Sequence, residues 1–352
     1  MAVATIVLAT YNRPSLLTFA VTSVLKQTFQ DWVLLVVGDG CDDRTASCLA
    51  AFDDSRIFYV NIDSRCGEQS GPNSAGMRAA KTKYVAFLNH DDIWLPFHLE
   101  TAIRSMEKNQ ADIYCANAIF TTYAKDKGSY RYAAKTTNPR ERLYEHAFYC
   151  RPTVFEPVSS WVVRRNSAEL VGDWTPAATI VRTPLEDWLL RAWRAGLRAI
   201  FSNRVSVLYC NAEKKIWLKK DGEARGKFYD MDASEQAHWS KMLEEKGASK
   251  LLSQAKKDIA VIASKTNFFD HRSSGFEDGW VLESLLTPAT ARIYHKLGWD
   301  AFDQVCALLD IQSGQALALM LERRTGETLP SHKSWDQVCS FVSTELACDP
   351  NW

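Results

Sequence analysis

The sequence predicts an α/β fold, a mainly parallel sheet flanked by helices, followed by a helical C-terminal part. In the first half, short apolar runs alternate with segments of helical periodicity, which is typical of βαβ units. From about residue 221 this alternation stops and helical periodicity continues alone. We therefore expect two domains in the 352 residues, 1–215 and 216–352.

The predicted elements follow one another in regular order. Strands are expected at 4–9, 32–37, 57–60 and 84–88, and helices at 13–26, 42–49 and 73–81. Pro14 suits a first helical turn because its φ angle is fixed. Residues 63–72 are rich in turn formers and predict a loop.

Further along the chain, helices are expected at 233–245 and 251–264 and again within 289–321, with a polar and aromatic loop at 267–278 between them.

Composition narrows the function classes and the location. Lys+Arg and Asp+Glu both number 42, which argues against a nucleic-acid binder and against a strongly basic membrane-surface protein. The apolar start reads as a first strand, and no run approaches the ~18–20 residues that span a bilayer. The nine cysteines form no Cys-x-x-Cys pair, which suits reduced thiols. We expect a cytoplasmic protein without a transmembrane segment.

Polar clusters follow three predicted strands, at 10–13, 38–40 and 89–92. Parallel strands end at one sheet edge, where open α/β sheets bind ligands. Asp91 and Asp92 are costly there unless a cation neutralises them, and a divalent metal with a phosphate-bearing substrate would do so. Taken singly, the clusters also read as two turns and a helix cap. Neither Gly-x-Gly-x-x-Gly nor a P-loop is present.

The order of several motifs carries a resemblance. They are Ile6-Val7-Leu8-Ala9-Thr10-Tyr11-Asn12-Arg13, Gly38-Asp39-Gly40-Cys41-Asp42-Asp43-Arg44-Thr45, Gly76-Met77 with Ala80, Phe87 to Pro96, Ser159 to Arg165, Val171 to Trp174, and Leu185 to Trp188 ahead of Arg191. In this order and spacing the chain resembles family 2 glycosyltransferases of the Rossmann-like GT-A fold, over roughly residues 3–210. That resemblance implies a nucleotide-diphosphate sugar donor and transfer with inversion.

The resemblance also implies residue roles in donor binding. Thr10, Tyr11 and Arg13 would border the nucleotide, and Asp39 would bond its base, often uracil. Oxygen-ligated Mn²⁺ or Mg²⁺ would neutralise the diphosphate leaving group, held by Asp91.

Asn89 and His90 complete this expected donor site. Asn89 stands where the family has an acid, which would weaken metal binding or make it depend more on the donor's phosphates. His90 could face the ribose or the metal, although a single histidine is more often structural. Asp92 is expected to cap the following helix, on which His98 and Arg104 are expected to be exposed.

Asp187 matches the family's catalytic base, with Glu186 as the next candidate. An inverting displacement needs one carboxylate to take the proton of the acceptor hydroxyl. The same pair also reads as the capped start of a helix, and both readings can hold together because a helix N-terminus keeps an acid ionised.

Two further positions depart from the family. Ser74 replaces its Asn, with Asn73 adjacent. Many members carry a His after the strand that follows the base region. Here a lysine, one of Lys214, Lys215, Lys219 and Lys220, would supply the positive partner for phosphate instead, although a solvated basic loop is at least as good a reading.

We therefore expect a metal-dependent, inverting glycosyltransferase that uses a nucleotide sugar, with UDP favoured. Its acceptor would be a glycan, a lipid-linked glycan or a protein, and peripheral membrane association and a homo-oligomer remain compatible with the sequence. By analogy, residues 216–352 would shape the acceptor groove or an oligomer interface. The alternative is a sugar-nucleotide or glycan-binding pseudoenzyme without turnover. A nucleotidyltransferase is disfavoured because no Gly-rich basic loop stands near the N-terminus.

Overall fold

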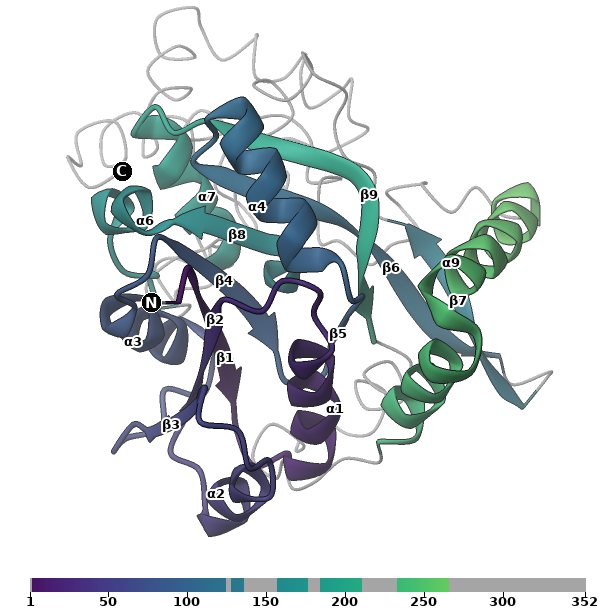
Figure 1. Ribbon diagram of the computed structural model, residues 1–352, viewed down its shortest axis with the longest axis horizontal. Coiled ribbons are helices and arrows are strands. Elements are labelled where there is room, and N and C mark those ends of the chain that lie inside the picture. Colours follow the sequence, from purple (N-terminus) through teal and green to yellow (C-terminus); the bar gives the residue numbers. More distant parts are fainter. Residues whose placement is uncertain (1, 125–127, 136–156, 177–183, 211–232, 266–352) are drawn as a thin grey trace, which may run out of the picture. The chain divides into compact units, whose positions relative to one another are not determined.

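The computed structural model describes residues 2–124, 128–135, 157–176, 184–210 and 233–265. These residues all belong to one compact unit. Within them the predicted α/β class is confirmed, with one sheet and helices packed around it (Figure 1). The expected domain boundary between residues 215 and 216 falls outside the described residues and stays a prediction.

The first four strands form the parallel part of the sheet. They are β1 (Ala4–Thr10), β2 (Trp32–Gly38), β3 (Ile57–Asn61) and β4 (Tyr84–Asn89), and they lie in the order β3-β2-β1-β4. Thr10 pairs with Gly38, and Ala9 pairs with Asn89. The carboxyl ends of β1, β2 and β4 therefore meet at one edge, as the sequence predicted.

Beyond β4 the sheet is mixed. Its strands there are β8 (Trp161–Arg164), β6 (Ile113–Ala124), β9 (Ala199–Tyr209), β5 (Ile93–Trp94) and β7 (Ser129–Lys135). Strand β8 is antiparallel to both β4 and β6, whereas β6 and β9 are parallel. Strand β5 pairs with β9, so the chain crosses from β4 to the far part of the sheet immediately after Asp91 and Asp92.

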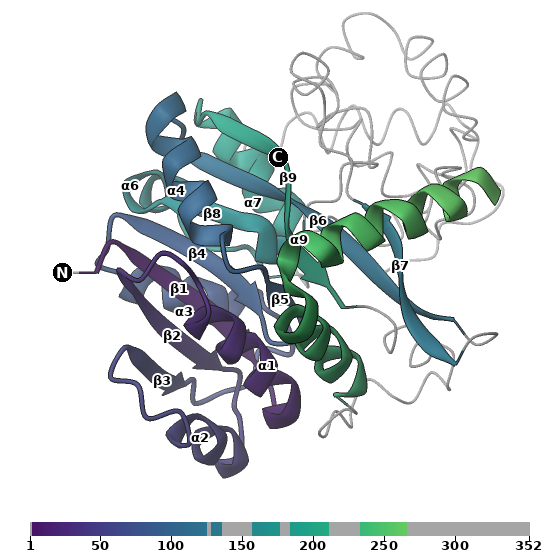
Figure 2. The same cartoon turned by 45° about the vertical axis from the view of Figure 1, so that its right-hand side comes forward.

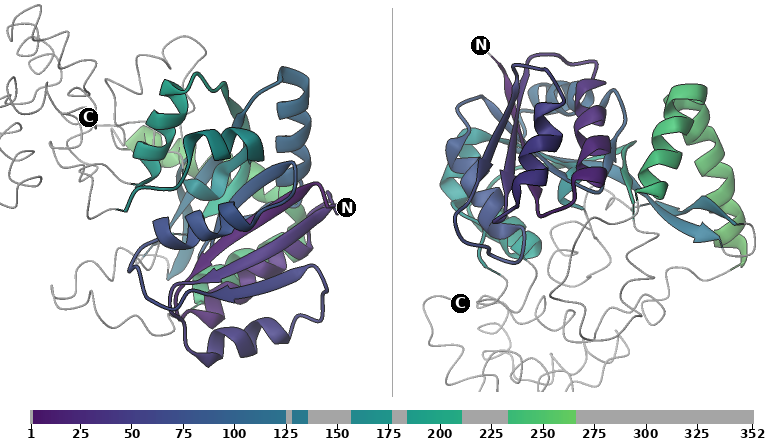
Figure 3. Two further views of the ribbon diagram at one scale, coloured as in Figure 1. Left: turned by 90° about the vertical axis from the view of Figure 1, so that its left-hand side faces the viewer. Right: turned by 90° about the horizontal axis from the view of Figure 1, so that it is seen from below.

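Helices cover both faces of the parallel strands. The described helical segments are α1 (Pro14–Leu25), α2 (Asp43–Ala50), α3 (Ser70–Ala79), α4 (His98–Asn109), η1 (Val158–Ser160), α6 (Arg165–Val171), α7 (Pro184–Arg194) and α9 (Ser234–Lys265). Ile6 and Leu8 join a core cluster with Leu17 of α1, whereas Val7 faces Gly76 of α3. Successive residues of a strand point to opposite faces, so α1 and α3 lie on opposite sides of β1 (Figure 3).

Three expectations about these helices can now be compared with the structure. Helix α3 begins at Ser70, three residues before the predicted start, because Pro72 falls in the first turn, where its missing N–H costs nothing. His98 is fully buried rather than exposed, because it packs against Trp94 with ring centroids 4.3 Å apart. Arg104 is exposed, as expected.

Helix α9 returns the C-terminal part of the chain to the sheet. Gly247 breaks it with a φ of 72°, which separates the two helices predicted at 233–245 and 251–264. Trp239 packs on Tyr132 of β7 with ring centroids 4.5 Å apart, and Glu244 pairs with Lys26 next to α1. Helix α9 thus lies against β7 and α1 (Figure 2). Residues 267–278 and 289–321 lie outside the described residues. No helix in the described part of the chain is long and apolar enough to cross a membrane.

Candidate functional site

A cavity of about 270 Å³ lies at the edge where β1, β2 and β4 end. All seven side chains that were expected to contact the donor or the metal line it: Thr10, Tyr11, Arg13, Asp39, Asn89, His90 and Asp91. The structure thus brings together three motifs that span about 80 residues of sequence. Their individual roles stay predictions.

The end of β1 turns sharply into the cavity. Asn12 has a positive φ of 43°, a conformation that asparagine tolerates better than most residues. Its side-chain oxygen accepts a hydrogen bond from the backbone N–H of Asp42 at 2.8 Å, which ties this turn to the start of α2. The Thr10 hydroxyl is buried and has no hydrogen-bond partner among the described residues. A bound ligand could therefore satisfy it.

Asp39 holds a loop over the cavity. Its two carboxylate oxygens accept hydrogen bonds from the backbone N–H groups of Cys66, at 2.6 Å, and Gly67, at 2.8 Å. The Arg65 guanidinium stacks on the Tyr11 ring, 4.1 Å from its centroid. Asp39 is only 4% exposed, so this loop and the end of β2 form one ordered wall.

No function was expected of this loop, although four of its residues line the cavity, Arg65, Gly67, Glu68 and Gln69, together with Pro72 at the start of α3. A signal was present in the cluster of turn formers directly after the third predicted strand.

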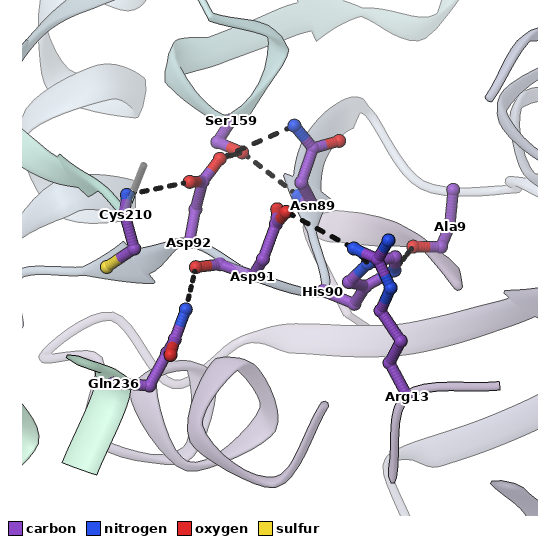
Figure 4. A network of polar contacts seen from close by, with 9 residues as sticks. All are labelled: Ala9, Arg13, Asn89, His90, Asp91, Asp92, Ser159, Cys210 and Gln236. Atoms are coloured by element: carbon purple, nitrogen blue, oxygen red, sulfur yellow. Dashed lines mark hydrogen bonds and ion pairs between the residues drawn. The ribbon is translucent and has the colours of Figure 1, made fainter. Parts of the chain in front are cut away.

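Arg13, His90 and Asp91 form a small polar network (Figure 4). His90 Nδ1 lies 3.2 Å from the carbonyl oxygen of Ala9, which can only accept, so Nδ1 carries the proton. His90 Nε2 then accepts from Arg13 Nη1 at 3.0 Å. Arg13 Nη1 also lies 3.7 Å from Asp91 Oδ2. Burial lowers the pKa of Arg13 from its ordinary value and Asp91 raises it; the guanidinium stays charged because its ordinary pKa is so high.

Asp92 does not cap the following helix, so that expectation is wrong. Its carboxylate accepts from the Ser159 hydroxyl at 2.5 Å and from the Cys210 backbone N–H at 3.3 Å, and Asn89 Nδ2 lies 3.4 Å from it. Phe97 occupies the cap position of α4 instead. Asp92 is fully buried and joins β4 to β9 and to the 3₁₀ turn before β8. The two adjacent acids therefore differ in position, since Asp91 lines the cavity and Asp92 is buried in the core.

Helix α9 contributes to the same corner. Gln236 Nε2 donates a hydrogen bond to the backbone carbonyl of Asp91 at 3.0 Å, and Gln236 is only 4% exposed. Next to it, the buried Glu235 accepts from the Thr121 hydroxyl of β6. The sequence analysis missed Gln236 because nothing local connects residue 236 with residue 91.

Few side chains at the cavity could act as metal ligands. No group of three or more His, Cys, Asp and Glu side chains that could hold a metal ion occurs within the described ranges. Of the three carboxylates that line the cavity, Asp39 and Glu68 already accept hydrogen bonds from neighbouring backbone and side-chain groups, and Asp91 lies beside the neutral amide of Asn89 at the end of β4. One or two carboxylates, with the rest of the ligands from substrate phosphate and water, are common for Mg²⁺. The residues therefore fit a metal that arrives with a diphosphate, and they do not form a metal cage by themselves.

Asp187 lies at the first turn of α7 and is not among the residues that line this cavity. Its Oδ2 accepts from the Thr175 hydroxyl at 2.7 Å and from Arg191 Nε at 2.9 Å. Arg191 also donates to the carbonyls of Val171 and Asp173 at 2.7 and 2.6 Å. The carboxylate is thus held beside the turn after α6, with its side chain 19% exposed.

Five of the remaining residues named in the sequence analysis have side chains outside the described residues, and another, Ser74, forms a hydrogen bond. The side chain of Glu186 lies outside the described residues, as do Lys214, Lys215, Lys219 and Lys220. Ser74 accepts from the backbone N–H of Trp174 at 2.9 Å, so its hydroxyl joins α3 to the segment before α7.

The comparisons with known proteins point in one direction. Residues 5–172 match the family described as Glycosyl transferase family 2. An Escherichia coli protein named UDP-Glc:alpha-D-GlcNAc-diphosphoundecaprenol beta-1,3-glucosyltransferase WfgD is 35% identical over 112 residues, which are 32% of this chain and 44% of that protein. The succinoglycan biosynthesis protein ExoW of Rhizobium meliloti is 35% identical over 121 residues, 33% of this chain and 38% of its own.

These alignments span less than half the length of either relative. Among solved structures, TarS 1–349 of S. aureus in complex with UDP aligns with 96% of this chain and 90% of its own, at 13% identity and a TM-score of 0.49.

Proposed function

Because residues 5–172 of this chain match glycosyl transferase family 2, we propose that the protein is an inverting, metal-dependent glycosyltransferase. In this proposal it moves a sugar from a nucleotide-diphosphate sugar to the hydroxyl of an acceptor in a single displacement. The observation that carries the proposal is the gathering of seven expected donor-site side chains around one cavity, at the end of the parallel strands where α/β sheets bind ligands.

Different residues that line the cavity would bind different parts of the donor. Asp39 and the loop that it holds would receive the base, and the unpartnered hydroxyl of Thr10 would receive a polar atom of the nucleoside. Arg13 and Asp91 lie where the diphosphate would reach the end of β4. UDP is the favoured nucleotide, because WfgD, which is 35% identical to this chain over 112 residues, is named for UDP-Glc.

A divalent cation, Mn²⁺ or Mg²⁺, would be held by Asp91 together with the donor's phosphates. When bound, it would neutralise the negative charge that develops on the leaving diphosphate. The protein's own part is to hold Asp91 in position, through the Gln236 hydrogen bond to its carbonyl and the neighbouring Asp92 network.

Asp187 is proposed as the base that takes the proton of the acceptor hydroxyl. The Thr175 hydroxyl and Arg191 Nε hold its carboxylate at the first turn of α7. Among the described residues both hydrogen bonds to the carboxylate fall on Oδ2, so Oδ1 is the atom proposed to take the proton.

A second candidate function is a sugar-nucleotide or glycan-binding protein without turnover. The observation that favours it is that the end of β4 brings one carboxylate, Asp91, to the cavity, with Asn89 where the family has an acid. Such a protein would bind the donor nucleotide, gain little from a metal and release no nucleotide product.

A donor screen tests the proposal. The purified full chain is incubated with UDP-, GDP- and dTDP-sugars, Mn²⁺ or Mg²⁺ and a panel of acceptors, and released nucleoside diphosphate is measured. Lipid-diphosphate-linked sugars are the first acceptors to try, since WfgD and WfaP are named for them. We expect release from one donor class. A folded protein that binds a nucleotide but releases none with any pair would support the second candidate instead.

A further inference from the structure

Within the proposed function, we infer that Arg13 acts as the cation of the donor site, so that it supplies charge to the diphosphate and competes with the metal for Asp91. The inference names a residue that sets the metal dependence of donor binding, and it rests on the proposed function for the identity of the ligand.

The first support is the position of Arg13. Its side chain is only 15% exposed, and it lines the cavity beside Asp91, whose side chain is 9% exposed. Nη1 lies 3.7 Å from Asp91 Oδ2. His90 accepts from the same nitrogen at 3.0 Å and is itself fixed by the Ala9 carbonyl. The guanidinium is therefore held at the carboxylate by two contacts and is not a loose surface charge.

The second support is the ion pair itself. Asp39 accepts from two backbone N–H groups, and Glu68 accepts from the N–H and hydroxyl of Ser70. Within the described part of the chain, Asp91 is the cavity carboxylate that forms an ion pair with Arg13.

The third support is the chemistry of the two cations. A divalent metal at this site would be held by the Asp91 carboxylate. It would share that carboxylate with the guanidinium, and two positive groups on one acid repel each other. A guanidinium also matches the geometry of phosphate oxygens in a paired, two-bond contact. Because Asn89 stands in place of a second acid, the site binds a divalent metal less strongly, and the pairing of Asp91 with Arg13 gains in relative strength.

The test measures UDP affinity by isothermal titration with EDTA and then with saturating Mn²⁺, in the full chain and in Arg13→Gln. The quantity compared is the factor by which Mn²⁺ tightens UDP binding. We expect Arg13→Gln to weaken UDP binding in EDTA by at least tenfold and to raise that factor by at least tenfold. Arg13→Lys, which keeps the charge, should stay near the wild-type factor, and thermal unfolding of both variants checks that each is folded.

Arg104→Gln is the matched control, because Arg104 is an exposed arginine paired with Glu100 on α4. It should leave both affinities unchanged. A second measurement follows Mn²⁺ alone by electron paramagnetic resonance, and Arg13→Gln should bind Mn²⁺ more tightly than the wild type because Asp91 is released.

Two kinds of result would overturn the inference, and they are distinct. If Arg13→Gln leaves the Mn²⁺ factor unchanged or lowers it, the competition is absent while the proposed function stands. If the wild-type chain binds none of UDP, GDP and dTDP with or without Mn²⁺, the proposed function fails and the inference fails with it.

Discussion

Asp187 receives both of its described hydrogen bonds on one oxygen, from Thr175 and Arg191. An Asn side chain can accept the same two bonds through its amide oxygen, but it cannot take a proton from the acceptor. We therefore predict that Asp187→Asn lowers kcat by about 10²–10⁴-fold, the usual contribution of a general base, while UDP affinity changes by less than about threefold.

The measurement pairs steady-state kinetics with titration of UDP. Asp173→Asn serves as the control, because Asp173 is an exposed acid on the neighbouring turn whose carboxylate pairs with Arg78. It should keep kcat near wild type. Retention of most activity in Asp187→Asn would make the base assignment wrong and direct attention to Glu186.

His98 predicts a pH dependence of stability. It is fully buried, and burial lowers its pKa to about 3, below an unfolded value near 6.5. The unfolded chain binds more protons between these values, so stability is full above pH 6.5 and falls as the pH drops toward 3. The loss by pH 5 is about 2 kcal/mol, at 1.36 kcal/mol per pH unit.

Chemical unfolding at pH 7.5 and pH 5 checks this in wild type and His98→Phe. The phenyl ring keeps the packing on Trp94 and gives up the Ser206 hydrogen bond, so the variant is less stable at pH 7.5. The gap between the two proteins should narrow at pH 5. A gap that is the same at both values would mean that His98 does not titrate as its burial implies.

At the scale of elements, the contact of α3 with β1 depends on one missing side chain. A Cβ on Gly76 would lie 2.3 Å from a methyl carbon of Val7, which is fully buried on the stiff central strand. We predict that Gly76→Ala destabilises the protein by about 1–3 kcal/mol, the usual cost of overpacking a core.

The double variant Gly76→Ala/Val7→Ala separates this clash from a general intolerance of the helix. Removing the Val7 methyls makes room, so the double variant should lose less free energy of unfolding than the sum of the two single losses. Simple additivity, measured by urea unfolding of all four proteins, would argue against the close approach.

At the scale of the whole molecule, the cavity is assembled from β1, β2, β4 and the loop held by Asp39, so only the folded chain can bind the donor nucleotide. UDP should therefore raise stability as its concentration rises, by about 2.7 kcal/mol at 100 times its Kd. Thermal unfolding across a UDP series measures this, with uridine as the comparison that lacks the diphosphate. A midpoint that does not respond to UDP would contradict donor binding at this site.

The sequence predicted the parts of the site that depend on short stretches of chain. Thr10 and Asp39 each end an apolar run, and parallel pairing is enough to bring those ends together. It did not predict the partners of Asp92 or the burial of His98, because these depend on Ser159, Cys210 and Ser206, which lie 67 to 118 residues further along the chain. Local pattern favoured a cap and a solvent-facing helix, and tertiary contacts decided otherwise.

The hydrogen bond from Gln236 to the carbonyl of Asp91 joins residues 145 positions apart. A ribosome that adds about 5–20 residues per second needs roughly 7–30 s to pass from one to the other. During that interval the nascent chain contains the ends of β1, β2 and β4 but lacks the hydrogen bond from Gln236 to the carbonyl of Asp91. Contacts of such long range also slow folding, because the intervening loop must close first. The acidic corner of the cavity is therefore completed late in biosynthesis, after every strand of the described sheet has been made.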